Sequence, residues 1–225
     1  MLSRTAKATY YALAGPAMAL NGRLYRGLRA PRSPGLRVHL GPGQVNYIDG
    51  WINVDANRFT GRCDVWADLR NPLPFHDGTV GALYSHHVVE HLPDIARHFA
   101  DAFRCLAPGA VYRVAGPHGD MAIRKFDQGD AGWFGDFPDR RRSIGGRFEN
   151  FVFCRQEHLT ILTRSFVMEL LEDAGFTQLE SCMPVRETRH PALFSDVLRF
   201  ENEDDFEYPH TLVIEAVKPG RNTGA

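Results

Sequence analysis

Short apolar strands separated by turns dominate the chain from residue 36 onward. Leu36 to Leu40 alternates apolar and polar residues and ends at a glycine turn, the pattern of a half-buried strand. Apolar residues recur at helical spacing from Ile95 to Leu106, after Pro93 and Asp94, and this pattern predicts a helix. We predict further strands at 52–55, 64–68, 80–84 and 111–115.

Residues 118–160 interrupt this rhythm, because glycines and aromatic residues alternate there without a regular period. We predict an insert that acts as a cap or lid, since glycines permit movement and aromatic rings exclude water. A helix near 164–174 and strands near 178–183 and 211–217 follow. Strands joined by helical crossovers favour an α/β domain with a mostly parallel sheet and helices on both faces.

A Pro/Gly-rich linker at 30–35 marks the expected start of the folded domain. We therefore expect a basic leader at 1–35, a single domain at 36–218 and a short tail at 219–225. The four cysteines are scattered without a C-x-x-C pair, which argues against a zinc framework or a disulfide scaffold. Such cysteine usage favours a reducing cytoplasm.

The near-neutral formal charge of −1 hides an asymmetry, because residues 1–48 contain basic residues and no acidic one. A basic and partly apolar leader favours contact with an anionic membrane face, and a solvated arm is the alternative. A signal peptide is disfavoured because Gly15-Pro16 interrupts the apolar run of residues 8–20. The acidic remainder has no basic stripe, which argues against a nucleic-acid partner.

Glycines and acids stand where the first three strands end. Gly41 and Gly43 follow the first strand, Asp55 ends the second and Asp68 ends the third. Open α/β sheets bind ligands at the carboxyl ends of their strands. Too few residues separate Gly41 from Asp55 for a normal helix, which disfavours a dinucleotide-binding fingerprint. Each feature alone could be a plain turn or cap, and together they favour a nucleoside pocket.

Several sequence runs resemble the S-adenosylmethionine-dependent methyltransferases with a Rossmann-like fold. More narrowly, they resemble a bacterial group associated with surface-polysaccharide and lipopolysaccharide biosynthesis. The likeness covers about residues 36–218, except much of 119–150, and its first crossover is shortened. The runs that carry it are VHLGPGQVNYIDGWINVDAN, ADLRNPLPF, LYSHHVVEHL, CLAPGAVYRVAGP, LLEDAGF, RHPALF and LVIEAVKP.

The resemblance implies S-adenosylmethionine as cofactor and assigns its contacts. The loop of Gly41 and Gly43 would hold the methionine part, Asp55 the ribose, and Asp68 with Leu69 the adenine. The segment from Ser85 to His87 would line the methyl-transfer site. Pro42 departs from the family pattern, which usually has a small residue or cysteine there, and it provides no amide donor.

A hydroxyl acceptor must lose a proton, and a histidine near neutral pH suits that role. His87 is the first candidate and His86 the second, while a wall residue without a proton role is the alternative for each. Residues 87–91 also match the H-x-x-E-H pattern of inverted zinc proteases. A five-residue match arises by chance and its context differs, so we expect no metal site.

These observations predict methyl transfer to a sugar hydroxyl or a related glycan-precursor group, in effect an O-methyltransferase. We expect a cytoplasmic protein, peripheral on the inner membrane face through residues 1–35. A catalytically silent cofactor-binding protein that acts as a membrane-associated assembly or regulatory partner is the alternative, motivated by Pro42 and by the lack of an unambiguous base.

Overall fold

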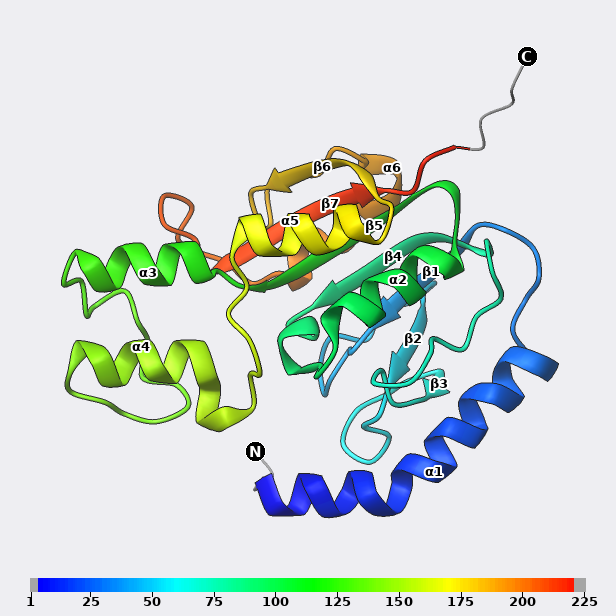
Figure 1. Ribbon diagram of the computed structural model, residues 1–225, viewed down its shortest axis with the longest axis horizontal. Helices are drawn as coiled ribbons and strands as arrows, with labels where there is room; N and C mark the ends of the chain where they lie inside the picture. The colour runs from blue at the N-terminus through cyan, green and yellow to red at the C-terminus, as the bar shows by residue number, and fades with distance from the viewer. Residues whose placement is uncertain (1–3, 221–225) are drawn as a thin grey trace.

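The computed structural model describes residues 4–220, and most of the predicted tail lies outside this range. A seven-stranded sheet with the order β3-β2-β1-β4-β5-β7-β6 forms its centre (Figure 1). Strands β1 to β5 pair in parallel, and β7 runs antiparallel to both β5 and β6. The predicted α/β class is confirmed. The strands are β1 (Leu36–Leu40), β2 (Ile52–Asp55), β3 (Val65–Trp66), β4 (Val80–His86), β5 (Leu106–Pro117), β6 (Thr177–Cys182) and β7 (Thr211–Val217).

The strand register brings the ends of three strands to one edge of the sheet. Leu40, the last residue of β1, pairs with Val54 of β2 and with Ser85 of β4. No helix separates β1 from β2, as the short spacing predicts. The third strand is shorter than predicted because only Val65 and Trp66 pair with β2.

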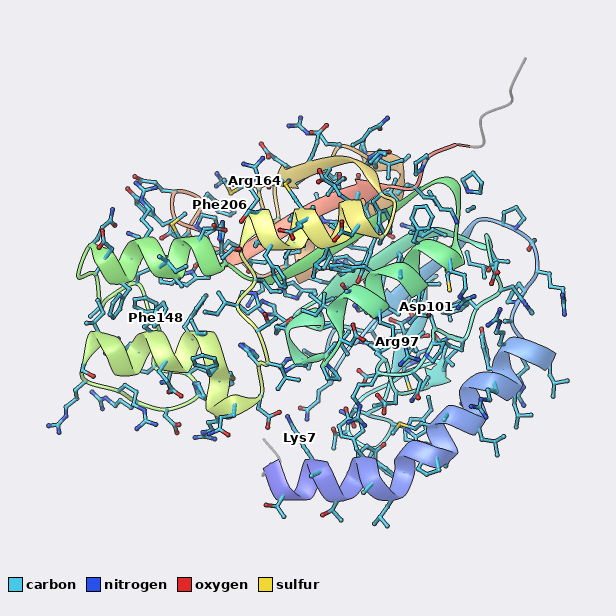
Figure 2. The ribbon with its side chains drawn as sticks, viewed as in Figure 1. Lys7, Arg97, Asp101, Phe148, Arg164 and Phe206 are labelled. Atoms are coloured by element: carbon cyan, nitrogen blue, oxygen red, sulfur yellow. The ribbon has the colours of Figure 1, made fainter. Side chains whose placement is uncertain are left out.

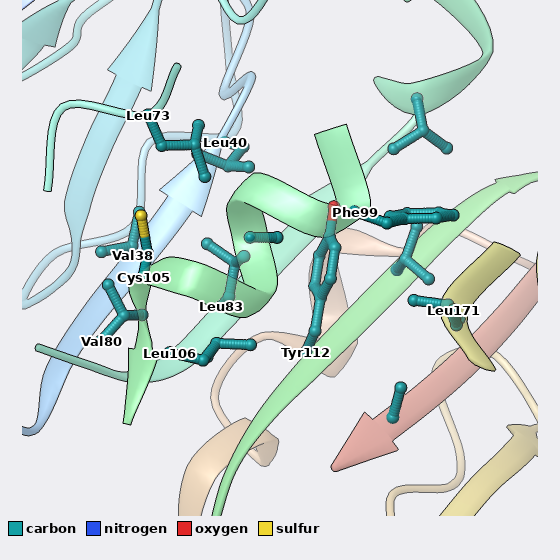
Figure 3. Packing of buried hydrophobic residues seen from close by; sticks show 14 of the residues in the cluster. Val38, Leu40, Leu73, Val80, Leu83, Phe99, Cys105, Leu106, Tyr112 and Leu171 are labelled. Carbon is teal, nitrogen blue, oxygen red and sulfur yellow. The ribbon is translucent and has the colours of Figure 1, made fainter. Parts of the chain in front are cut away.

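Two helices cover one face of the sheet, α2 (Ile95–Cys105) and α5 (Arg164–Asp173) (Figure 1). Asp94 caps α2 by accepting a hydrogen bond from the Arg97 amide, which is a favoured helix start. Figure 3 shows Phe99 of α2 and Leu171 of α5 packed with Tyr112 of β5 in the main core.

The opposite face is covered by shorter elements, α6 (Pro191–Phe194) and η3 (Leu198–Phe200). Phe194 and Val197 pack there with Trp51 and Tyr84. Leu83 and Tyr84 are neighbours on β4, but Leu83 packs in the main core and Tyr84 packs with Phe194 and Val197 on the opposite face. They separate because successive strand residues point to opposite faces. Both faces are therefore covered by helical segments, as predicted.

The segment predicted as an irregular insert contains two helices, α3 (Gly119–Asp127) and α4 (Ile144–Phe153), followed by η2 (Cys154–Gln156). They extend beyond the end of β5 in Figure 1. Trp133 and Phe134 are buried between them with Phe148 and Phe151 nearby. This aromatic packing overcomes the low helix propensity of the glycines. Movement of the segment as a lid stays a prediction.

The leader is not a free arm, because residues 4–28 form helix α1 (Arg4–Leu28), which docks along the β3 edge. The Asn21 side chain donates to the Trp66 carbonyl at 2.8 Å, and Met18 is fully buried. Pro16 lies inside the helix without ending it. Within residues 4–220, no helix has the length and apolar character needed to cross a bilayer.

Two buried histidines predict acid sensitivity of the fold. Burial lowers the pKa of His39 and of His98 to about 4, while the unfolded value is about 6.5. Unfolding therefore takes up protons as the pH falls from about 6.5 to about 4. Each histidine should lower the free energy of unfolding by about 1.4 kcal/mol per pH unit in that window.

Urea denaturation between about pH 7 and pH 5 checks this expectation. The free energy of unfolding should depend less steeply on pH in the His98→Gln variant than in the wild type. The difference in slope should correspond to about one proton. Equal slopes in the two proteins would show that His98 is not held neutral in the folded state.

Candidate active site

The loop after β1 is tied directly to the end of β2. The Gly43 amide donates to Asp55 Oδ2 at 2.8 Å, and the Asn57 amide donates to Asp55 Oδ1 at 2.7 Å. Gly43 has φ of +60°, a conformation that glycine adopts without a steric penalty. The structure therefore places the predicted glycine turn and the first predicted acid in contact.

The two glycines differ in what surrounds them. A Cβ atom at Gly41 would lie 2.4 Å from Val88 Cγ2, so this glycine admits the chain that follows β4. A Cβ atom at Gly43 would meet nothing within 4 Å. The open space that a ligand needs is therefore beside Gly43, and the close neighbour of Gly41 is a packed side chain.

Asp68 lies close to Asp55 and is buried against an arginine. The Ala67 amide donates to the Asp55 carbonyl at 3.0 Å, which joins the two acidic segments. Both Asp68 oxygens accept from the Arg70 guanidinium at 2.7 to 3.0 Å. Leu69, between them, packs against the main core. The predicted acids thus converge at one edge of the sheet.

Helix α1 also reaches this acidic pair, which the sequence did not predict. The Arg70 guanidinium lies 3.9 Å from the centre of the Tyr11 ring. Burial and the negative charge of Asp68 raise the pKa of the Tyr11 hydroxyl. Tyr10 donates to the Ala56 carbonyl, just after Asp55, at 2.5 Å. The only signal in the sequence was a tyrosine pair inside an apolar run.

These residues fit an adenosyl ligand through their carboxylates. A carboxylate has about four lone-pair sites, so Asp55 retains capacity after its contacts with the Gly43 and Asn57 amides. Asp68 accepts four hydrogen bonds from Arg70, two at each oxygen, so a ligand at Asp68 would replace part of the Arg70 contact. Asp55 would hold ribose hydroxyls, and Asp68 would hold the adenine amino group. The loop offers fewer amide donors, because Pro42 has none and the Gly43 amide is used by Asp55.

The end of β4 directs consecutive side chains to different places. The Ser85 hydroxyl is buried and lies 2.9 Å from the Tyr112 hydroxyl inside the protein. Its side chain is thus committed to the core, and only its backbone faces the strand ends. Burial, followed by the proximity of His87 and His39, lowers the pKa of His86 to about 2. Such a weakly basic ring is poorly suited to accept a proton near neutral pH.

His87 leaves the strand with φ of +54° and turns toward Glu90. Its Nδ1 atom lies 3.2 Å from Glu90 Oε1, and the His87 ring is exposed while Glu90 is buried. A carboxylate partner at Nδ1 leaves Nε2 as the accepting nitrogen. This arrangement would allow His87 Nε2 to accept a proton at the edge where the three strands end.

Residues 87–91 do not form one helical turn with two ligands on one face. Only Val89–His91 is helical, as the short η1 segment. His87 is in the left-handed region instead, so the two histidines of the H-x-x-E-H match do not lie on one face of a helix.

Comparison with known proteins finds a family match in the central part of the chain. The family described as "Methyltransferase domain" matches residues 40–114, the span from the end of β1 into β5. No curated protein sequence matches the chain. The matched span includes the glycine loop, Asp55, Asp68 and His87.

Solved structures similar to this chain share little sequence with it. An S-adenosylmethionine-dependent methyltransferase from Mesorhizobium loti is 16% identical, with 85% of this chain and 95% of that chain covered and a TM-score of 0.48. A possible histamine N-methyltransferase from Thermotoga maritima is 16% identical, with 96% of both chains covered and a TM-score of 0.49. Phosphoethanolamine N-methyltransferase 2 from Haemonchus contortus, in complex with S-adenosyl-L-methionine, is 14% identical, with coverages of 88% and 51% and a TM-score of 0.49.

These likenesses are too distant to transfer an acceptor or a residue role to this chain. The family match rests on the chain's own residues 40–114, where the glycine loop and both acids lie at one edge of the sheet. Residues 40–114, a third of the chain, thus match a methyltransferase domain, and S-adenosylmethionine is the methyl donor that this match indicates.

Proposed function

We propose that this chain transfers a methyl group from S-adenosylmethionine to a hydroxyl oxygen of a sugar or a related glycan precursor. The pairing of His87 with Glu90 at the end of β4 carries this proposal. A hydroxyl must lose its proton during transfer, whereas a neutral amine can attack before deprotonation. An oriented histidine base therefore favours an oxygen acceptor. The sequence resemblance to the glycan-linked group supplies the substrate class.

The protein has three tasks in this reaction. S-adenosylmethionine supplies a methyl group that its positively charged sulfur already activates. Asp55 and Asp68 hold the nucleoside so that the methyl group is fixed relative to the acceptor, and such alignment supplies much of the rate. His87 Nε2 accepts the hydroxyl proton while the oxygen bonds to the methyl carbon and the carbon–sulfur bond breaks. Glu90 stabilises the histidine that becomes positively charged.

A His87→Gln variant should transfer methyl groups about 100-fold to 10,000-fold more slowly than the wild type, the usual effect of losing a general base. Transfer of tritium from labelled S-adenosylmethionine to glycan of cell-envelope extracts measures this. His190→Gln is the control, since His190 caps α6 and does not belong to the segment that follows β4.

Label in glycan that depends on His87 supports an enzyme over a silent cofactor-binding protein. Absence of transfer by a wild-type protein that binds S-adenosylmethionine would instead favour the silent alternative. Label that appears only on amines would overturn the assignment of oxygen as the acceptor atom.

We further propose that the outer side of α1 contacts the anionic inner face of a membrane. Leu13, Leu20, Leu24 and Leu28 are exposed, and their spacing places them on one side of the helix. The absence of acidic residues from positions 1–48 adds electrostatic attraction to anionic lipids.

Replacing Leu13 and Leu28 with glutamine should weaken sedimentation with phosphatidylserine-containing vesicles without unfolding the protein, because both side chains are more than three-quarters exposed. Substitution is a better test than removal of residues 1–35, because α1 packs against the β3 edge and its removal would disturb the fold. Binding of the wild type should fall as salt is added. Equal sedimentation of wild type and variant at all salt concentrations would refute membrane contact through this face.

A further inference from the structure

A cluster of three potential metal ligands lies beside His87. One oxygen of Glu90 and one ring nitrogen each of His91 and His158 lie within 4.8 Å of one another. Glu90 and His91 belong to η1, while His158 lies in the loop after η2. The Leu159 amide donates to the Glu90 carbonyl at 2.7 Å. The fold therefore joins two distant segments at this point.

Both histidines are held in the form that binds a cation. His91 Nδ1 lies 2.9 Å from the Glu157 carbonyl, and His158 Nδ1 lies 3.1 Å from the Val152 carbonyl. A carbonyl oxygen only accepts, so each Nδ1 carries the proton and each Nε2 has a free lone pair. This backbone support is typical of metal-ligating histidines.

The loop that carries these groups is anchored from the other side by α1. Lys7 Nζ lies 2.6 Å from Glu157 Oε2, and Figure 2 shows Lys7 directed from α1 toward this part of the chain. The same residue, Glu157, orients His91 through its carbonyl. The positive charge of Lys7 is thereby paired with a carboxylate.

Glu90 provides a second and independent observation, an unpaired carboxylate oxygen in a buried side chain. Its side chain is fully buried, and Oε2 has no hydrogen-bond partner among the described residues. Leaving a buried polar atom unpaired costs free energy. Gly116, at the end of β5, would place a Cβ atom 3.3 Å from this oxygen. A cation bound to the carboxylate would compensate its burial.

We propose that Glu90, His91 and His158 bind one divalent transition-metal ion of the zinc class. Two imidazoles and one carboxylate are a ligand set for such ions, and three protein ligands leave a coordination position open. Ligand atoms around one zinc ion lie roughly 3.4 Å apart, given bonds of about 2.0 to 2.2 Å. His91 Nε2 lies 3.9 Å from Glu90 Oε1, about 0.5 Å more than that separation.

Because the proposed metal site lies beside His87, its open coordination position would face the place where the acceptor is expected. An oxygen atom of the acceptor could occupy it, and the cation would then help to orient the acceptor at the end of β4. Orientation of the acceptor by the metal ion rests on the proposed methyl transfer. Binding of the metal ion does not depend on that proposal, because it is measured without S-adenosylmethionine or an acceptor.

The test is titration of the full-length, tag-free protein with Co²⁺, followed by visible absorption, with equilibrium dialysis against Zn²⁺. We expect one equivalent of each ion and no sulfur-to-cobalt charge-transfer band. Glu90→Gln and His158→Asn should each weaken binding by more than about 100-fold, beyond the 10- to 100-fold typical of outer ligand partners. His190→Asn is the matched control and should bind like the wild type.

Circular dichroism and thermal unfolding without metal show whether each variant is folded, and bound metal should raise the midpoint only in the wild type and the control. Failure of the wild type to bind one equivalent overturns the site, whatever the variants do. Equal weakening by His190→Asn, or a sulfur-ligation band, also overturns it. None of these results would alter the methyl-transfer assay, so the two proposals fail separately.

Discussion

An Asp55→Asn variant should bind S-adenosylmethionine about 100-fold more weakly than the wild type. The expected loss is that of charge-assisted hydrogen bonds to the two ribose hydroxyls, each contributing about 1.5 to 3 kcal/mol. A change of about 1.4 kcal/mol is a tenfold change in affinity, so partial compensation by the asparagine still leaves a large effect. Isothermal titration calorimetry measures it directly.

The substitution also weakens the attachment of the glycine loop, because Asp55 accepts from the Gly43 and Asn57 amides. Asp49→Asn is therefore the control, since Asp49 is an almost fully exposed acid in the loop before β2. It should bind the cofactor like the wild type. Undiminished binding by Asp55→Asn would remove Asp55 from the site.

An Arg113→Met variant should lose about 3 to 5 kcal/mol of stability, the usual cost of leaving a buried charge without its partner. Arg113 is fully buried in β5. Its guanidinium binds Glu201 at 2.6 and 2.9 Å and Glu215 at 2.6 Å. Burial opposes this charge, yet the two carboxylates raise the pKa of Arg113 above its usual value. Removing it leaves two buried carboxylates unpaired.

This network also fixes the segment that covers the second face of the sheet. Glu201 accepts from the Val185 amide at 2.8 Å, and Glu215 accepts from the Arg189 amide at 2.8 Å. At about 2 to 4 °C per kcal/mol for a chain of this size, the melting midpoint should fall by roughly 6 to 20 °C.

Combining Arg113→Met with Glu201→Gln and Glu215→Gln should recover part of that loss, because no uncompensated charge remains. Thermal unfolding of the single and triple variants separates charge from packing. A triple variant less stable than Arg113→Met would show that the loss comes from volume and not from unpaired carboxylates.

The sequence predicted those elements whose local pattern agrees with their surroundings. Leu36–Leu40 and Ile52–Asp55 have the predicted bounds, because their alternation matches burial on a sheet. Helix α1 was not predicted, because nothing local shows that Met18 becomes fully buried against the rest of the chain. Helices α3 and α4 were missed for a related reason, since their glycines have low helix propensity and their aromatic partners are distant in sequence.

The candidate site likewise has features that the sequence predicts and features that depend on the folded chain. Parallel strands share an edge, so the approach of Asp55 to the glycine loop could be predicted from topology. That Tyr11 would lie over Arg70 depends on the docking of α1. The sequence does not indicate that His158 lies beside Glu90 and His91, because these residues belong to another segment and only the folded chain brings them together.

The most direct test of the central claim is a crystal structure with S-adenosylhomocysteine, the product that retains the adenosine. We predict that the ribose hydroxyls contact Asp55, that the adenine amino group contacts Asp68 and that the sulfur lies beside the end of β4 near His87. Adenosine bound elsewhere, with Asp55 and Asp68 free of it, would contradict the account.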